Sequence, residues 1–289
     1  MPTTPRRPLA PMLAREAVEA FDDPGFLFEI KWDGYRALAE RAPDGRLHLW
    51  SRTGRDLSPR FPALAEALRQ EIVHPCLLDG EIVALAEGAS DIRRLQRRQE
   101  PIVYVVFDLL RWRTEDLLPL PLRERRARLA DRVGGSDRLV RSEGVVGAGV
   151  SYFRAVRAAG LEGMMAKALR SPYLPGVRSD AWRKVLNLRE GTFAVVAAEP
   201  GPADGVAAVW VADVDGRPVA RIAGLPPAAA RRVRARAAGH VLAPGGSRRP
   251  ALAVAPGLSC RVRYRSVLPG GKLRHPLFAG LVAEGEDGV

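Results

Sequence analysis

The sequence predicts two domains, an α+β domain in residues 1–187 and a smaller β-barrel in residues 188–289. Antiparallel strand pairs alternate with amphipathic helices in the first part. Short strands separated by Gly/Pro turns fill the second part, and the pattern changes after Asn187. A chain of 289 residues has room for two ordinary domains, each with its own core.

The first domain begins with an antiparallel hairpin from Phe26 to about Ser51, reversed at Asp44–Gly45. Residues 62–72 have the apolar spacing of a helix. The later elements follow in chain order: a strand with its own Asp-Gly turn at 77–85, a short basic helix at 91–98, a buried strand at 102–110, and amphipathic helices at 121–133 and 149–160. This alternation of strands and helices predicts an α+β domain.

The second domain is predicted from a run of short strands. They lie at residues 193–200, 206–214, 217–225, 251–255 and 259–268, with one arginine-rich helix at 226–239. Five strands and a helix suit a small barrel of the OB type, which often binds nucleic acid.

Composition narrows the class of protein. A net charge of +12 and a pI near 10.6 favour a polyanionic partner, with nucleic acid the first candidate. No apolar run reaches the roughly 18 residues of a membrane span, and the N-terminus lacks a secretory core, so we expect a cytoplasmic protein. Cys76 and Cys260 lie far apart and histidine is scarce, which argues against disulfides or zinc. Any metal would be a hard cation held by carboxylates.

Lysine is rare in this chain, with four lysines beside 41 arginines. Three of them, Lys31, Lys167 and Lys184, stand inside short motifs. An amine can lose its proton and attack an electrophile, whereas a guanidinium with a pKa above about 12 cannot. Codon bias alone would also leave few lysines, so the motifs decide between the two explanations.

The motifs around these lysines resemble those of the covalent nucleotidyltransferases in content and in order. KWDGYR at 31–36 matches the signature KxDGxR. The others follow in sequence: SRTGRD at 51–56, LLDGEIV at 77–83, YVVFDLL at 104–110, LEGMMAK at 161–167 and WRKV at 182–185. Further segments, PMLA, LQRR, SPYLPGVRS and LRHPLFAGL, are similar to the ATP-dependent DNA ligase domain of bacterial end-joining and short repair ligases. The resemblance implies a nucleotidyltransferase (adenylation) domain followed by an OB-fold barrel.

The resemblance also implies roles for individual residues. Lys31 would be the nucleophile that takes AMP from ATP and holds it covalently. Lys167 and Lys184 would be neighbouring charges that lower its pKa and hold phosphate oxygens. Glu29 would contribute to adenine recognition, and Phe107 would stack on the adenine.

Arginines and carboxylates complete the expected site. Arg36 and Arg52 suit forked contacts with the ribose or with the 5'-phosphate of a nicked strand. The resemblance places Asp33, Glu81 and Glu162 around the ribose and Mg²⁺, where carboxylates orient hydroxyls and hold the metal.

The expected partner is double-stranded DNA with nicks or ends. The candidate DNA contacts are Arg52, Arg93, Arg94, Arg97, Arg98 and Arg274. Arginine contacts to phosphates position a protein without reading sequence, as a ligase requires. By the same resemblance the protein would be a bacterial, nucleoid-associated monomer, to which a Ku-like end-binding protein could deliver DNA.

Two departures from the family pattern concern phosphate chemistry. The motif WxKxK has Leu186 where its second lysine is expected, and the basic C-terminal RxDK-like ending is replaced by GLVAEGEDGV. We therefore expect slower self-adenylation, with Lys272 and Arg274 as the remaining basic residues that could compensate. Two alternatives stay open: an RNA ligase or capping-type nucleotidyltransferase, and a catalytically impaired ligase-fold protein that only binds nucleic acid.

Overall fold

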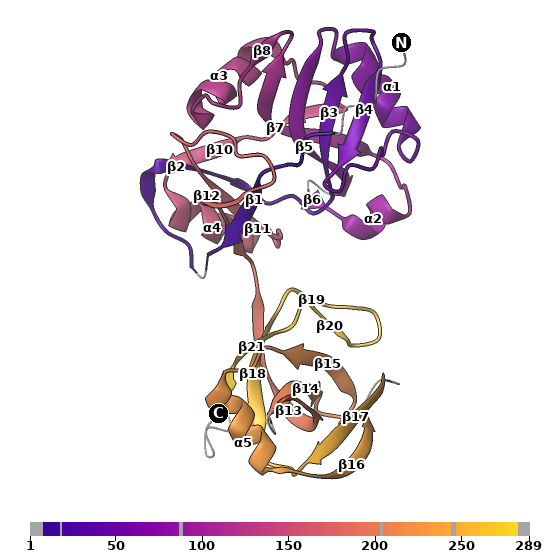
Figure 1. Ribbon diagram of the computed structural model, residues 1–289, viewed down its shortest axis with the longest axis vertical. Helices are drawn as coiled ribbons and strands as arrows, with labels where there is room; N and C mark the ends of the chain where they lie inside the picture. The colour runs from indigo at the N-terminus through magenta and orange to yellow at the C-terminus, as the bar shows by residue number, and fades with distance from the viewer. Residues whose placement is uncertain (1–7, 18, 87–88, 203–204, 244–246, 283–289) are drawn as a thin grey trace. The chain divides into compact units, whose positions relative to one another are not determined.

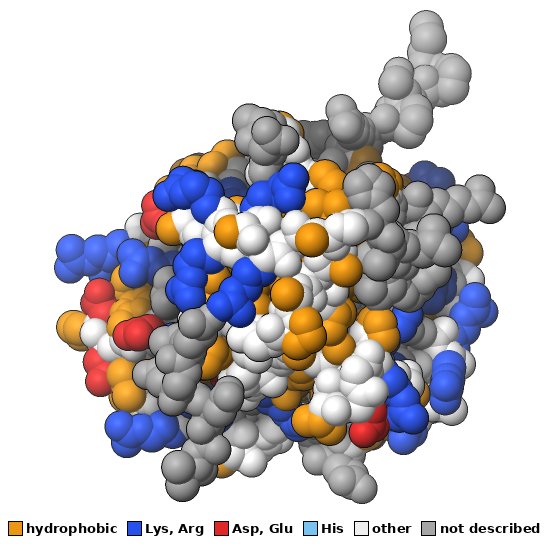
Figure 2. Space-filling model, turned by 90° about the horizontal axis from the view of Figure 1, so that it is seen from below, with side chains coloured by type: hydrophobic (Ala, Val, Ile, Leu, Met, Phe, Trp, Pro, Cys, Tyr) orange, Lys and Arg blue, Asp and Glu red, His pale blue; other side chains and the backbone are white. Residues whose placement is uncertain are grey.

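The structure is a computed structural model that describes residues 8–17, 19–86, 89–202, 205–243 and 247–282 (Figure 1). The chain divides into two compact units, Met1–Asn187 and Leu188–Val289. Within the described residues, no helix is long and apolar enough to cross a membrane. Figure 2 shows one face of the molecule, on which Lys and Arg side chains lie at several separate places and Asp and Glu side chains are fewer.

The first unit contains two mainly antiparallel sheets. One sheet has the order β1 (Leu13–Glu16), β12 (Arg178–Leu186), β11 (Gly163–Ala168), β2 (Asp23–Ile30) and β10 (Gly144–Gly147). The other has the order β4 (Leu47–Ser51), β3 (Tyr35–Arg41), β5 (Cys76–Ala86), β7 (Ile102–Trp112) and β8 (Glu115–Asp116), with β6 (Ala89–Ser90) on β5 and β9 (Leu139–Arg141) on β7. The hairpin predicted around Asp44–Gly45 is β3–β4.

The helices of this unit are α1 (Pro62–Glu71), α2 (Ile92–Gln96), α3 (Leu122–Arg132) and α4 (Gly149–Ala158). Helix α1 forms because Pro62 sits in the first turn, where its missing N–H costs nothing, and Leu64 and Leu68 face the core. Strand β7 is buried from residue 102 to residue 110 because a separate cluster packs on each face: Tyr104 belongs to one cluster and Phe107 to the other.

The turn predicted at Asp79–Gly80 is wrong, because both residues lie inside the continuous strand β5. Asp79 is fully buried and pairs with Arg36, so it does not lie in an exposed turn. Gly80 is required by packing: a Cβ there would come within 2.5 Å of Tyr104 Cζ and of the Val105 carbonyl oxygen. An Asp-Gly pair therefore marks a close approach of strands here.

Replacing Gly80 with alanine should destabilise the first unit by about 1–3 kcal/mol, because the added methyl group overpacks β5 against β7. Urea unfolding measures this change. Gly134→Ala is the matched control, since nothing lies within 4 Å of a Cβ at that position. A Gly80→Ala protein as stable as the Gly134→Ala protein would contradict the packing argument.

The second unit is a curled antiparallel sheet. Its elements are β13 (Arg189–Pro200), β14 (Val206–Ala212), β15 (Pro218–Ala223), α5 (Pro227–Ala235), β16 (Ala237–Ala243), β17 (Ser247–Val254), β18 (Ser259–Tyr264), β19 (Ser266–Val267), β20 (Leu273–Arg274) and β21 (Leu277–Leu281). The long strand β13 pairs first with β18 and later with β14 and β17, with register shifts near Val195 and Glu199. Such irregularities bend a strand and let one sheet curl around its own core.

The predicted helix at 226–239 is too long. Helix α5 ends at Ala235, and the alanine-rich segment after Arg236 forms strand β16 against β17, with Ala238 opposite Ala253. Alanine favours a helix locally, but strand pairing supplies backbone hydrogen-bond partners that the sequence pattern does not reveal.

Candidate active site

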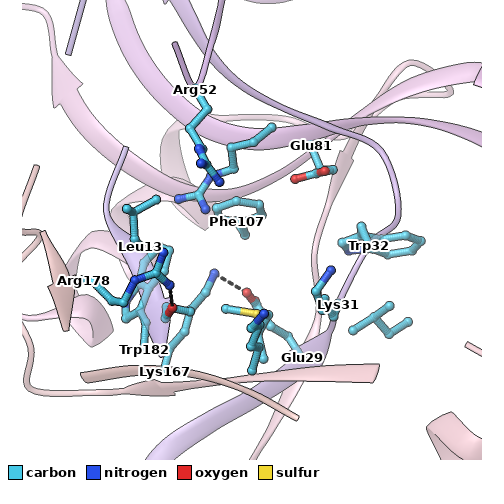
Figure 3. Close-up of a pocket in the computed structure, with 15 residues that line it drawn as sticks. Leu13, Glu29, Lys31, Trp32, Arg52, Glu81, Phe107, Lys167, Arg178 and Trp182 are labelled. Atoms are coloured by element: carbon cyan, nitrogen blue, oxygen red, sulfur yellow. Dashed lines mark hydrogen bonds and ion pairs between the residues drawn. The ribbon is translucent and has the colours of Figure 1, made fainter. Parts of the chain in front are cut away.

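A cavity of about 310 Å³ lies within the first unit, between its two sheets (Figure 3). Its wall is formed by residues from seven strands, β1, β2, β3, β5, β7, β11 and β12, and from the segments just after β2 and β4. They are Leu13, Ala14, Glu29, Ile30, Lys31, Trp32, Arg36, Arg52, Glu81, Phe107, Met165, Lys167, Arg178, Trp182 and Lys184. This set includes every lysine, arginine and aromatic residue expected at the nucleotide, together with Glu29 and Glu81, but neither Asp33 nor Glu162. The volume is in the range of small-molecule sites.

The pairing of β2 with β11 places Lys31 beside Glu162. Ile30 lies opposite Met164, so the residues just past each strand are neighbours, and Lys31 N donates to the Gly163 carbonyl at 2.9 Å. The Lys31 ammonium pairs with Glu162 Oε1 at 2.5 Å. Gly163 has a φ of +154°, and a Cβ there would stand 2.2 Å from the Val185 carbonyl oxygen. Glycine is therefore needed for this close approach.

A second lysine–glutamate pair lies deeper in the cavity. Glu29 and Lys167 are diagonal neighbours on β2 and β11, and they form an ion pair with only 2% and 1% of their side chains exposed. The Lys167 amine also lies 3.8 Å from the centre of the Phe107 ring and 4.3 Å from that of Trp182. Burial lowers the pKa of Lys167, and the Glu29 carboxylate opposes that shift. Lys167 is thus paired with Glu29, among the groups expected to bind the base, whereas Lys31 is paired with Glu162.

Arg36 is held by a buried network. Its Nε and Nη2 each donate to an Asp79 carboxylate oxygen at 2.6 Å, and Tyr173 Oη donates to Asp79 Oδ2 at 2.7 Å. Met12 N donates in turn to Tyr173 Oη at 3.0 Å. Burial by itself would lower the pKa of Arg36, but the Asp79 carboxylate raises it. The forked contact that was expected between Arg36 and the ribose or the 5'-phosphate is therefore made to Asp79 instead. Arg36 also packs over the Phe107 ring.

The carboxylates near Lys31 are suited to a hard cation. Burial raises the pKa of Glu81 to about 8, against the charges of Arg36 and Lys31, and Glu162 adds to the rise. Two carboxylates that repel each other, one in the cavity wall and one beside it, fit Mg²⁺, which takes one or two protein carboxylates together with phosphate oxygens. Among the described residues, no group of three or more His, Cys, Asp or Glu side chains could hold a metal alone. Asp33 is outside the cavity wall, where its N–H donates to Ser90 Oγ at 3.0 Å.

The other expected contacts are dispersed. Lys184 reaches the cavity and pairs with Glu16 at 3.0 Å. On and after α2, Arg93, Arg97 and Arg98 are exposed, while Arg94 is half-buried and donates to the Glu100 carbonyl at 3.0 Å. Arg274 is on β20 of the second unit. Of the expected DNA contacts, Arg52 lines the cavity.

Comparison with known proteins decides the family. The family model described as ATP dependent DNA ligase domain matches residues 9–185. The chain belongs to this family. The match covers the whole cavity of this ligase domain, including the motifs at Lys31, Lys167 and Lys184.

Individual relatives support the same assignment. The ligase chain is 36% identical to DNA ligase C1 of Mycolicibacterium smegmatis over 191 residues, covering 59% of this chain and 55% of that protein. The crystal structure of the ligase domain from M. tuberculosis LigD has a TM-score of 0.59 at 28% identity, covering 97% of this chain and 98% of the other. A mycobacterial DNA ligase D complexed with ATP and MES has a TM-score of 0.59 at 29% identity, covering 96% and 95%.

These matches also bear on the extent of the resemblance. The chain spans about half the length of the curated relatives it matches. The structural matches confirm the predicted fold class, an α+β adenylation domain followed by an OB-like curled sheet.

The ligase cavity contains residues that sequence reasoning missed. Arg178 brings a further guanidinium to the wall, held by its Nη1 donating to the Ala14 carbonyl. Trp182 is fully buried and stands opposite Lys167 on the neighbouring strand. Arg178 lies in SPYLPGVRS and Trp182 in WRKV, so the motifs contained the signal. Leu13 and Ala14 lie in the segment PMLA, and the parallel pairing of β1 with β12 brings them to the site.

Leu186 is at the end of β12, outside the cavity wall of the ligase domain. The nearby Arg183 does not replace the missing lysine, because its guanidinium packs over the rings of Phe21 and Phe26 and is not part of the cavity wall. The altered tail at 283–289 lies outside the described residues.

Proposed function

We propose that this chain is an ATP-dependent DNA ligase that seals breaks between a 5'-phosphate and a 3'-hydroxyl. The observation that carries the proposal is one cavity that is lined by Lys31 and Glu81 in one part and by Glu29, Lys167 and Phe107 in another. Glu162 lies beside this cavity, paired with the Lys31 ammonium. Such a cavity suits a nucleotide whose α-phosphate meets Lys31. Family membership makes ATP the nucleotide.

In the first step, the unprotonated Lys31 amine attacks the α-phosphorus of ATP. The Nζ–P bond forms, the bond from that phosphorus to the bridging oxygen breaks, and pyrophosphate leaves. Glu162, 2.5 Å from Nζ, is placed to receive the ammonium proton. Arg52, Arg178 and Lys184 line the same cavity and supply positive charge for the phosphates. Glu81 and Glu162 would hold Mg²⁺, which when bound offsets charge on the reacting phosphates.

The base would be recognised by the buried pair Glu29–Lys167. A carboxylate accepts hydrogen bonds and an ammonium donates them, so the pair presents both functions at the Phe107 ring. In the later steps AMP passes to a DNA 5'-phosphate, and a 3'-hydroxyl then displaces it. The exposed Arg93, Arg97 and Arg98 near α2 suit contact with the DNA backbone.

The cellular setting follows the same proposal. A DNA substrate places the protein in the cytoplasm with the nucleoid. We infer that it acts there as a monomer on nicks or ends, with a Ku-like end-binding protein as the partner that delivers ends. Co-sedimentation with such a protein on linear DNA tests the last point.

Incubation with ATP and Mg²⁺ should raise the intact mass of the purified protein by one AMP. GTP in place of ATP should give no gain, and the adenylated protein should seal a nicked DNA duplex faster than a nicked RNA duplex. A gain with GTP alone would favour the capping-type transferase. No gain and no sealing would favour the impaired binding protein, which is the alternative that Leu186 supports because it replaces the second lysine of the motif WxKxK.

A further inference from the structure

The chain has a single asparagine, Asn187, and it is the last residue of the first unit. It follows β12 directly and lies two residues past the segment that the family model matches. Its side chain is half-buried. Asparagine is depleted in strands, and its short amide side chain tends to hydrogen-bond to nearby backbone groups. A lone asparagine beside a strand therefore directs attention to the backbone that it contacts.

Asn187 hydrogen-bonds to two successive peptide groups in the segment after α4. Its side-chain Nδ2 donates to the Leu161 carbonyl at 3.0 Å, and its backbone N–H donates to the Glu162 carbonyl at 2.9 Å. These two carbonyls belong to the planar peptide groups on either side of the Glu162 Cα. The two bonds together therefore fix the direction in which the Glu162 side chain leaves the backbone.

Glu162 is the carboxylate that faces the proposed nucleophile. Its Oε1 is 2.5 Å from Lys31 Nζ, and 8% of its side chain is exposed. The Lys31 N–H donates to the carbonyl of the next residue, Gly163, at 2.9 Å. The backbone and the amine of Lys31 are thus both held by the segment that Asn187 holds in turn.

Tight packing behind this segment makes the contact with Asn187 sensitive to change. A Cβ on Gly163 would stand 2.2 Å from the Val185 carbonyl oxygen and 3.0 Å from Leu186 Cα, so the segment and the end of β12 are in direct backbone contact. There is no room for the segment to move closer to β12. A hydrogen bond lost at Asn187 is therefore not replaced by a closer approach of the backbone.

We propose that Asn187 is a positioning residue that holds the Glu162 carboxylate against the Lys31 amine during lysyl-AMP formation. Asn187 is outside the cavity wall, so it acts through Glu162 and not on the nucleotide. The proposal rests on the ligase function and adds to it a residue outside the matched family segment.

The first test measures lysyl-AMP formation by intact mass at several ATP concentrations. Asn187→Ala should lower the maximal rate roughly fivefold to tenfold, the effect of one lost hydrogen bond, and leave the KM for ATP unchanged. Asn187→Asp should be slower still, because a carboxylate would face the Leu161 carbonyl oxygen. The matched control is Ser151→Ala, which removes a bond from Ser151 Oγ to the Ala148 carbonyl on α4 and should match the wild type. A higher KM with an unchanged maximal rate would overturn the proposal.

A double-mutant cycle with Glu162→Gln separates positioning of Glu162 from a general loss of stability. If Asn187 acts through the Glu162 carboxylate, Asn187→Ala should cost less than about twofold in the Glu162→Gln background. An equal cost in both backgrounds would overturn the proposal, because Asn187 would then act independently of Glu162. Thermal unfolding shows that each variant is folded at the assay temperature.

Amide hydrogen exchange without nucleotide tests the geometry independently of the reaction. The Lys31 amide is bonded to Gly163, so it should exchange roughly fivefold faster in Asn187→Ala than in the wild type. Ser151→Ala should leave this exchange unchanged. Equal protection of the Lys31 amide in the wild type and in Asn187→Ala would overturn the proposal. A wild type that never takes up AMP would refute the ligase function instead, while the exchange comparison would still judge the role of Asn187.

Discussion

Lys31→Ala should abolish the gain of one AMP in the presence of ATP and Mg²⁺. The amine is the nucleophile in the proposed mechanism, and removal of a covalent nucleophile costs about 10⁴-fold or more in rate. Lys31 pairs with Glu162, so the alanine variant also removes that ion pair. Intact-mass measurement over time gives the rate, and thermal unfolding shows whether the variant remains folded.

Lys31→Arg is the matched control for this loss. A guanidinium keeps the positive charge opposite Glu162 but cannot lose its proton to attack phosphorus. This variant should be as inactive as Lys31→Ala while being closer to the wild type in stability. If either variant still acquires AMP at the wild-type rate, another residue is the nucleophile and the assignment of Lys31 is wrong.

Among substitutions in the site, Asp79→Ala should cause the largest loss of stability, about 3–5 kcal/mol in the free energy of unfolding. The carboxylate is fully buried and accepts hydrogen bonds from Arg36 and Tyr173, so its removal leaves the Arg36 charge without its anion. Adenylation should also slow, because Arg36 lines the cavity and packs on Phe107.

Urea unfolding followed by tryptophan fluorescence measures this effect, since four of the five tryptophans precede residue 188. Tyr173→Phe is the graded comparison: it removes one donor to Asp79 and leaves the pair with Arg36, so it should cost about 1–2 kcal/mol. Equal costs for the two variants would mean that the hydroxyl, and not the ion pair, dominates the network.

Much of the site was predictable because each motif is local and carries its chemistry in residue type. An amine in KWDGYR, an aromatic residue in YVVFDLL and a carboxylate in LLDGEIV can each be read from a few neighbouring residues. The cavity contains the expected Lys31, Phe107 and Glu81. The elements were also predictable wherever the apolar spacing was regular, as in α1 and β7.

The rest depended on contacts between distant segments. Tyr173 and Asp79 are 94 residues apart, and nothing near either one indicates the other. The interpretation of Asp79–Gly80 as a turn failed for the same reason, since neighbouring strands made both residues buried. The end of α5 was misplaced because the pairing of β16 with β17 outweighed alanine's local preference for a helix.

The amino-acid sequence alone was enough to identify the family and to predict the kinds of reacting groups and their order along the chain. The tertiary structure determined which charged side chains pair with one another. Lys31 lies against Glu162, Lys167 against Glu29 and Lys184 against Glu16. Ion pairing acts over a few ångströms, and those distances are fixed by strand register, which places residues far apart in sequence beside one another. The register of β2 and β11 therefore separates Lys31, the proposed nucleophile, from Lys167, which is held beside the groups proposed to bind the base.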